Sequence, residues 1–278
     1  MLKKRVISAL WIIPVLIAAI WFEWPLPWFT VFIAVWGMMA VLEFYRLITA
    51  FRVPPLTPFG IIWTILFIVS SDSQLLSILG PRFNTDLLMP FLLTSAVVLP
   101  LIWLLLRIEK EKTFTSWAWT VAGILYVGWL LSYLTALRGM DDGRNLIFFT
   151  LFVTFASDSA AFFVGRTFGR QKLSPEISPG KTWEGAIGGV FGAALVSLFF
   201  ILPTPVSLPF SWGHAVILGI LVSIFGQLGD LAESLFKRNV GVKDSSKVIP
   251  GHGGFLDRID SVVFAGVVVY YYVVWVIQ

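Results

Sequence analysis

The sequence contains no cysteine and only two histidines, His214 and His252. Disulfide bonds, thiol catalysis and cysteine-bound zinc are therefore excluded, and a histidine-rich metal site has no support. Charged residues are also scarce, at 13% of the 278 residues, whereas 58% of the residues are hydrophobic and the mean hydropathy is +0.87. Soluble globular domains carry about 25% charged residues. We therefore expect a protein that is embedded in a lipid bilayer.

Nine apolar runs follow one another, each near the roughly 20 residues that a transmembrane helix needs. They cover residues 6–22, 26–48, 59–79, 87–106, 116–136, 145–165, 183–202, 212–236 and 261–277. The third run is the weakest because the polar segment "SSDSQ" (70–74) interrupts it. The first run is expected to stay as a span, because no small-residue cleavage site follows it. The sequence thus predicts an all-α integral membrane protein with about nine transmembrane helices.

The distribution of basic residues predicts the orientation of these helices. With nine spans and a cytoplasmic N-terminus, all but three of the 20 Lys and Arg lie on the cytoplasmic side; the exceptions are Arg82, Arg138 and Arg144. This asymmetry follows the positive-inside rule and places the C-terminus in the periplasm or outside. Because the basic residues follow the membrane, the net charge of +4 gives no reason to expect nucleic-acid binding.

The chain is expected to have two regions. Residues 1–140 hold about five of the spans, and residues 141–278 form a C-terminal region with two long, charged cytoplasmic loops at 165–185 and 237–260. The loops on the other side are short and plain. Chemistry is therefore expected on the cytoplasmic face of the C-terminal region.

Some carboxylates lie inside the apolar runs, among them Asp158 in the sixth and Asp230 and Glu233 in the eighth. A carboxylate at the centre of a span costs about 2.5–3.5 kcal/mol, so it needs a partner, a metal ion or a water-filled cavity. The eighth run also has a helical spacing of polar residues that predicts one polar face leading to the cytoplasm: Ser223, Gln227, Asp230, Ser234 and Lys237. Close helix packing is the alternative role for its small polar residues.

Asp257 and Asp260 are three residues apart, just before the last run. If a helix begins over 255–260, their Cβ atoms lie about 5–6 Å apart. Carboxylates that close repel one another unless a cation lies between them. Oxygen ligands favour Mg²⁺, which usually takes one or two carboxylates plus substrate oxygens. We expect Asp257 and Asp230 as the chief ligands, Asp260 and Asp158 as further ligands or supporting groups, and room for a second cation; helix capping is the alternative for a single Asp.

The basic residues and glycines of both loops suit phosphate groups. The expected substrate-binding residues are Arg238, Lys243, His252, Gly253, Gly254 and Arg258 in one loop, and Lys172, Ser178, Lys181 and Thr182 in the other. Attraction to anionic lipid explains the positive charge alone, but not the interleaved acids and glycines. "PEISPGKT" ends like a P-loop, yet Pro175 stands where that motif needs its first glycine.

Residues 234–260 closely resemble the signature of phosphatidate cytidylyltransferases, also called CDP-diglyceride synthetases. The matching positions are Ser234, Lys237, Arg238, Lys243, Asp244, Pro250, His252, Gly253, Gly254, Asp257, Arg258 and Asp260. Residues 157–185 resemble the other cytoplasmic segment of that family. The resemblance implies a Mg²⁺-dependent transfer of CMP from CTP to phosphatidic acid, which gives CDP-diacylglycerol and pyrophosphate in phospholipid biosynthesis. It also implies a bacterial inner-membrane location and a homodimer.

On this hypothesis the phosphate of phosphatidic acid attacks the α-phosphorus of CTP, and the catalytic residues are Asp257, Asp230, Lys237 and Asp260. A transporter or channel is one alternative, since it also needs intramembrane acids. However, the chain has no internal repeat, and its richest site lies at the cytoplasmic boundary. A different phospholipid-related transferase that uses the same Mg²⁺ chemistry is the other alternative.

Overall fold

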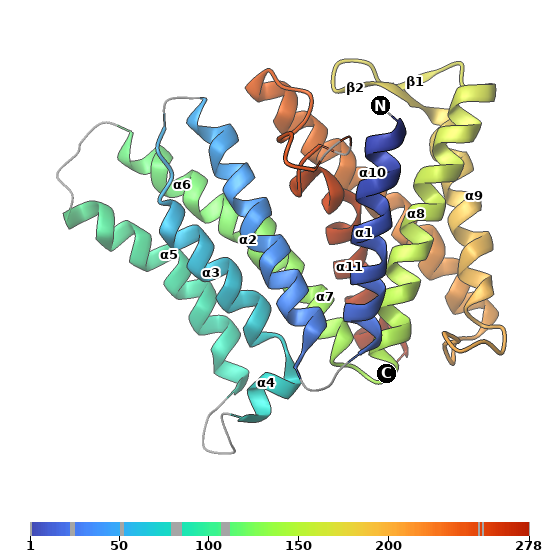
Figure 1. Ribbon diagram of the computed structural model, residues 1–278, viewed down its shortest axis with the longest axis horizontal. Helices are drawn as coiled ribbons and strands as arrows, with labels where there is room; N and C mark the ends of the chain where they lie inside the picture. The colour runs from blue at the N-terminus through green and yellow to red at the C-terminus, as the bar shows by residue number, and fades with distance from the viewer. Residues whose placement is uncertain are drawn as a thin grey trace. The chain divides into compact units, whose positions relative to one another are not determined.

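Helices dominate the computed structural model, which describes residues 2–22, 26–50, 53–78, 85–106, 112–249, 251 and 253–277, with only the backbone of residues 2–9 (Figure 1). Each predicted apolar run forms a helix within this part of the chain. These helices are α1 (Leu2–Trp21), α2 (Trp28–Thr49), α3 (Thr57–Ser70), α5 (Leu88–Leu106), the continuous α6–η2–α7 (Thr113–Gly123, Ile124–Trp129, Leu130–Arg138), α8 (Gly143–Phe168), α9 (Trp183–Phe199), α10 (Trp212–Val240) and α11–η4 (Asp260–Tyr272, Val273–Ile277).

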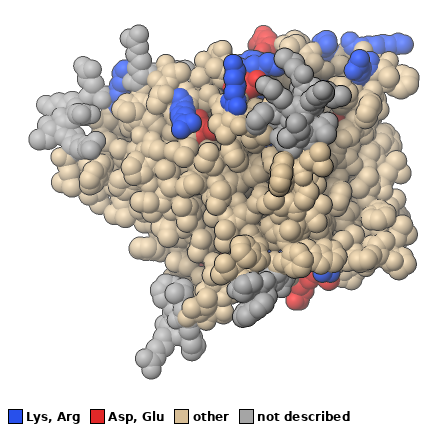
Figure 2. All heavy atoms as spheres, in the orientation of Figure 1, with Lys and Arg blue, Asp and Glu red and all other residues tan. Residues whose placement is uncertain are grey.

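Six of the described helical segments are long and apolar enough to cross a membrane. They are Trp28–Thr49, Thr85–Leu106, Thr113–Arg138, Gly143–Phe168, Trp212–Val240 and Asp260–Ile277. Three further apolar helices are shorter: Leu10–Trp21, Thr57–Ser70 and Trp183–Phe199. Large apolar side chains such as Phe91 and Leu195 are exposed, and Figure 2 shows that uncharged residues form most of the visible surface. The described chain is therefore a helical protein with several potential membrane spans.

The chain divides into two compact units. The first comprises Met1–Gly139 and Asp244–Arg258, and the second comprises Met140–Lys243 and Ile259–Gln278. The division near residue 140 lies close to the boundary that the sequence suggests. The segment Asp244–Arg258, which the sequence places in the C-terminal region, instead packs with the N-terminal unit.

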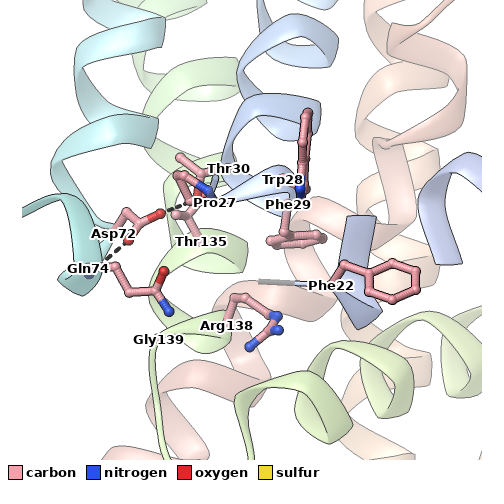
Figure 3. A pocket seen from close by; sticks show the side chains of 10 residues that line it. All are labelled: Phe22, Pro27, Trp28, Phe29, Thr30, Asp72, Gln74, Thr135, Arg138 and Gly139. Carbon is pink, nitrogen blue, oxygen red and sulfur yellow. Dashed lines mark hydrogen bonds between the residues drawn. The ribbon is translucent and has the colours of Figure 1, made fainter. Parts of the chain in front are cut away.

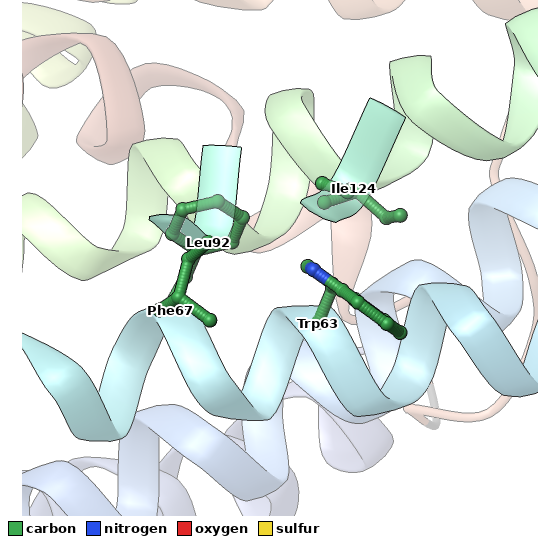
Figure 4. Packing of buried hydrophobic residues seen from close by; sticks show 5 residues of the cluster. Trp63, Phe67, Leu92 and Ile124 are labelled. Carbon is green, nitrogen blue, oxygen red and sulfur yellow. The ribbon is translucent and has the colours of Figure 1, made fainter. Parts of the chain in front are cut away.

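One hydrophobic cluster of the first unit lies between α3, α5 and η2. Trp63 and Phe67 of α3 pack against Leu92 of α5 and Ile124 of η2 (Figure 4). The indole N–H of Trp63 donates to the hydroxyl of Ser95, 3.1 Å away, so burial of this ring leaves no polar atom unsatisfied.

The third apolar run ends where the sequence shows its polar interruption. Asp72 follows α3 and caps the short helix α4 (Ser73–Ile78), because its Oδ1 accepts the N–H groups of Gln74 at 2.9 Å and Leu75 at 3.2 Å. Its Oδ2 accepts the hydroxyl of Thr30 in α2. The polar residues thus end one helix and begin another.

In the second unit, α9 packs against α8 and α10, and α10 packs against α11. Gly192 permits the close approach of α9 to α8, because a Cβ there would lie 2.5 Å from the Cβ of Ala160. The loop between α8 and α9 forms an antiparallel hairpin of β1 (Lys172–Ser174) and β2 (Ser178–Thr182) at one end of this pair (Figure 1). The sequence did not predict these strands.

Candidate functional site

The hairpin carries Lys181 to the face of α10. The Nζ atom of Lys181 lies 2.8 Å from Oδ2 of Asp230, and these side chains are 23% and 33% exposed. Lys181 also approaches the carbonyl oxygen of Gln227 at 3.5 Å. The structure therefore joins a predicted substrate-binding lysine to a predicted metal-binding carboxylate. An ion pair that keeps some access to solvent can exchange partners when a charged substrate arrives.

The predicted polar face of α10 is confirmed by hydrogen bonds along the helix. The Oγ atoms of Ser157 in α8 and Ser223 in α10 lie 2.7 Å apart. Gln227 Nε2 donates to Ser223 Oγ at 3.0 Å, and Ser234 Oγ donates to Asp230 Oδ1 at 3.2 Å. The small polar residues thus join α8 to α10 and hold the carboxylate of Asp230.

Lys237 forms a second ion pair one turn beyond Ser234. Its Nζ atom lies 2.5 Å from Oε2 of Glu233, and these side chains are 11% and 0% exposed. Glu233 was not among the predicted site residues. The signal was present, because an acid four residues before a lysine on a helix is placed to pair with it.

Asp260 is the first residue of α11, and its carboxylate interacts electrostatically with Asp230, Lys237 and Asp158. The approach of α11 to α10 depends on Gly229, because a Cβ there would clash with the backbone oxygen of Asp260. The second unit therefore groups three predicted acids with Lys237.

This group contains carboxylates that the sequence predicts as cation ligands. Within the described ranges, no three His, Asp or Glu side chains converge closely enough to hold a metal ion. Mg²⁺ usually takes only one or two carboxylates, and water and substrate phosphates supply its other oxygens. The carboxylates of Asp230 and Asp260 fit that requirement.

Asp257 has a different environment, in the first unit. Its Oδ2 accepts the N–H of Ser245 at 2.9 Å, the hydroxyl of Ser245 at 2.9 Å and the N–H of Gly254 at 2.8 Å. The expectation of one helix starting over 255–260 is wrong. Leu256–Arg258 form a short 3₁₀ turn, η3, and α11 starts only at Asp260. The α-helical spacing argument for Asp257 and Asp260 therefore does not apply.

Glu43 of α2 also binds this loop, and the sequence reasoning missed it. Its Oε2 accepts the hydroxyl of Ser245 at 3.0 Å and the N–H of Leu256 at 2.9 Å, and its Oε1 accepts the hydroxyl of Ser246 at 2.6 Å. The side chain is buried, with 1% of the residue exposed. A carboxylate in the second apolar run was the available signal, because such a group needs partners.

The other predicted substrate-binding residues lie at the ends of helices and in the two loops. Arg238 donates from Nε to the carbonyl oxygen of Ile177 at 3.1 Å and from Nη1 to that of Val242 at 3.2 Å, so it holds the hairpin loop to the end of α10. Thr182 caps α9, since its Oγ1 accepts the N–H of Gly185 at 3.1 Å. These two residues therefore already have structural contacts.

The remaining predicted positions are partly accessible. Lys172 pairs with Thr182 across the hairpin, and Ser178 begins β2. Lys243 and Arg258 are exposed, Gly253 has a left-handed backbone with φ +82°, and Gly254 is buried. His252 lies outside the described residues.

A small pocket lies in the first unit at the opposite end of α2 from Glu43 (Figure 3). It is lined by Phe22, Pro27, Trp28, Phe29, Thr30, Asp72, Gln74, Thr135, Arg138 and Gly139. Its volume is about 30 Å³. A cavity of this size accommodates only one or two water molecules, so it does not suit a nucleotide.

Comparison with known proteins agrees with the signature in the sequence. The profile of the cytidylyltransferase family matches residues 3–276. A phosphatidate cytidylyltransferase of Bacillus subtilis (strain 168) is 33% identical over 239 residues, which cover 85% of each chain. One of Brucella suis biovar 1 (strain 1330) is 45% identical over 161 residues, 56% of this chain and 58% of the relative. One of Staphylococcus saprophyticus is 40% identical over 176 residues, 63% of each chain. The chain belongs to the cytidylyltransferase family.

Proposed function

We propose that this chain is a phosphatidate cytidylyltransferase, an enzyme that transfers CMP from CTP to phosphatidic acid and releases pyrophosphate. The observation that carries the proposal is the similarity to the Bacillus subtilis enzyme over 85% of each chain. The site chemistry supports it, because the second unit combines carboxylates with two lysines beside apolar helices. A lipid phosphate and a soluble triphosphate need such charged groups at the membrane boundary.

In the proposed reaction, a phosphate oxygen of phosphatidic acid forms a bond to the α-phosphorus of CTP. The bond from that phosphorus to the oxygen bridging to the β-phosphorus breaks, and pyrophosphate leaves with the electron pair. The attacking group is already an anion, so no protein nucleophile is required. The protein has to bring two anions together and stabilise the developing negative charge.

Two lysines are proposed for this task. Lys181 is paired with Asp230, and Lys237 with Glu233. An ammonium has three N–H donors, so each lysine is proposed to donate to a substrate phosphate as well. The exposed Lys243 and Arg258 are proposed to bind further phosphate oxygens. The same role is proposed for the other residues expected to bind substrate: Arg238, Lys172, Ser178, Thr182, His252, Gly253 and Gly254.

We propose that Asp230 and Asp260 hold Mg²⁺, with Asp158 and Asp257 as further ligands or supporting groups and with room for a second cation. The bound ion would neutralise phosphate charge. The donor set supports this assignment, because carboxylates and phosphate oxygens are the ligands that Mg²⁺ prefers. Asp257 would serve the site mainly by holding the loop from Ser245 to Gly254 in shape.

The proposed setting is the bacterial inner membrane, with nine spans, a cytoplasmic N-terminus, an outside C-terminus and the active site on the cytoplasmic face. The distribution of Lys and Arg supports this orientation. The short helices α3 and α9 would complete the spans together with the longer ones. A homodimer is proposed from the family resemblance.

Purified protein in detergent tests the function with labelled CTP and phosphatidic acid. We expect labelled CDP-diacylglycerol and pyrophosphate in equal amounts, with Mg²⁺ required and EDTA inhibitory. Asp230→Asn should abolish the product, whereas Asp141→Asn, an exposed turn residue, is the matched control and should not. A folded parent protein that forms no CDP-diacylglycerol would refute the proposal and favour a transporter or another lipid transferase.

A further inference from the structure

One buried carboxylate of α2 binds three positions of the loop from Asp244 to Arg258. Both oxygens of Glu43 are used, Oε1 by the hydroxyl of Ser246 and Oε2 by the hydroxyl of Ser245 and the N–H of Leu256. Glu43 and these donors are more than 200 positions apart in the sequence, yet both lie in the first unit. The contact is therefore a connection between an apolar helix and the loop that carries the signature.

Both the Glu43 carboxylate and the loop lose stability if the contact is broken. A carboxylate inside an apolar span is costly unless donors surround it. Glu43 has the N–H of Leu256, the hydroxyl of Ser246 and the hydroxyl of Ser245, which it shares with Asp257. Conversely, the N–H of Leu256 is buried, and a buried N–H without an acceptor is destabilising. Without the loop, the Glu43 carboxylate would lack hydrogen-bond donors, and without Glu43 the N–H of Leu256 would lack an acceptor. Both losses raise the free energy, so the loop has one favoured position on α2.

Ser245 connects Glu43 to Asp257 by hydrogen bonds. Its hydroxyl lies 3.0 Å from Glu43 Oε2 and 2.9 Å from Asp257 Oδ2, so the two carboxylates share its one proton, and its backbone N–H also donates to Asp257. Gly254 is enclosed by the same groups, because a Cβ there would clash with both the Ser245 hydroxyl and the Glu43 carboxylate. Glu43 thus helps to define the shape of the loop on both sides of His252.

We propose that Glu43 is a positioning residue for the cytidylyl transfer: it fixes the signature loop on α2 so that the basic groups of the loop meet the substrate phosphates. This inference rests on the proposed function. Glu43 itself is buried and hydrogen-bonded on both oxygens, so we do not expect it to touch substrate. Its loss should lower the turnover number more than it changes the binding of CTP by the remaining groups.

Two measurements on the full-length chain in detergent test the proposal. Limited trypsin digestion reports the loop directly, because Lys247 is exposed within it and its peptide bond is cut faster when the loop leaves α2. Steady-state kinetics with CTP and phosphatidic acid, per folded molecule, report the consequence for the reaction. The variants are Glu43→Ala, Glu43→Gln and the control Asp72→Ala.

Asp72 is a matched control, because it is a buried carboxylate of the same unit that also accepts three hydrogen bonds, at the other end of α2. General weakening of the unit should affect both alanine variants equally. We expect Glu43→Ala to speed cleavage after Lys247 and to reduce kcat by about 10- to 100-fold, and Asp72→Ala to do neither. Glu43→Gln should recover part of kcat, since its amide oxygen can still accept the N–H of Leu256.

Equal cleavage rates after Lys247 in Glu43→Ala and Asp72→Ala would refute the anchor itself. Faster cleavage with an unchanged kcat would refute the positioning role. If Glu43→Ala does not fold, the same comparison is made with Glu43→Gln, for which intermediate effects on both measurements are required. A parent protein that makes no CDP-diacylglycerol would refute the proposed function, while the digestion would still decide whether Glu43 anchors the loop.

Discussion

The substitution Lys237→Met separates phosphate binding from a purely structural role of this lysine. Methionine keeps the apolar length of the side chain but removes the ammonium, which lies 2.5 Å from Oε2 of Glu233. A charge-assisted hydrogen bond to a phosphate contributes roughly 1.5–3 kcal/mol. Its loss corresponds to about a 10- to 150-fold decrease in catalytic efficiency, at 1.36 kcal/mol per tenfold. Lys237→Arg keeps the charge and should retain more activity.

Lys237→Met also breaks the buried ion pair with Glu233 and so lowers the stability of the protein. This effect has to be separated from the effect on catalysis. The side chains of Lys237 and Glu233 are 11% and 0% exposed, and removal of one member of a buried ion pair costs about 3–5 kcal/mol. The double variant Glu233→Gln/Lys237→Met removes both charges. We expect its melting temperature to return toward that of the parent protein, whereas its catalytic efficiency should stay low.

The assay combines steady-state kinetics in detergent with thermal unfolding followed by tryptophan fluorescence, for which the chain has 13 tryptophans. Activity is expressed per folded molecule, as measured by size-exclusion chromatography. A double variant with efficiency within twofold of the parent would refute the reasoning. Lys237 would then serve only to neutralise Glu233 or to extend toward anionic headgroups.

Three further predictions concern the loop and the topology. Asp257→Asn should lower turnover per folded molecule and speed tryptic cleavage of the loop, since the amide removes the negative charge and, with its oxygen at the Oδ2 position, turns an N–H donor toward the N–H of Ser245 where Oδ1 accepts it; unchanged turnover would exclude a catalytic role. Gly254→Ala should destabilise the protein by about 1–3 kcal/mol, because the added methyl group meets the Glu43 carboxylate; an unchanged melting temperature would contradict that packing. In intact cells an impermeant thiol reagent should label a cysteine at exposed Asp141 but not one at exposed Pro175; the reverse pattern would overturn the proposed orientation.

Most of the fold is predictable from the sequence because helix formation in lipid depends on local hydropathy. Every predicted apolar run contains a helix in the described chain. Even the weak third run is informative, since helix α3 ends at Ser70 and Asp72 caps the next helix. The hairpin of β1 and β2 was not predictable in the same way, because its short strands carry no long periodic pattern.

The candidate site was predicted by residue type, whereas its contacts were not. Asp230 and Lys181 were both expected in it, but their pairing depends on how the hairpin folds back onto α10. Glu43 was missed because its partners lie more than 200 positions later in the chain. The expected helix at Asp257 was wrong because hydrogen bonds from the loop, and not helical periodicity, determine the backbone there.

The carboxylates inside the apolar runs have partners that explain why they are tolerated. Asp230 binds Lys181, Glu233 binds Lys237, and Glu43 binds donors of the signature loop. Of these three, the pair of Lys181 and Asp230 is the one partly open to solvent on both sides, at 23% and 33% exposure, and a pair that remains partly hydrated separates at lower cost than a buried one. In the proposed reaction this pair is therefore the one that can exchange partners, with Lys181 turning to a phosphate and Asp230 to a cation. The buried pair and the Glu43 contacts cannot separate so cheaply, and they suit the fixed parts of the site.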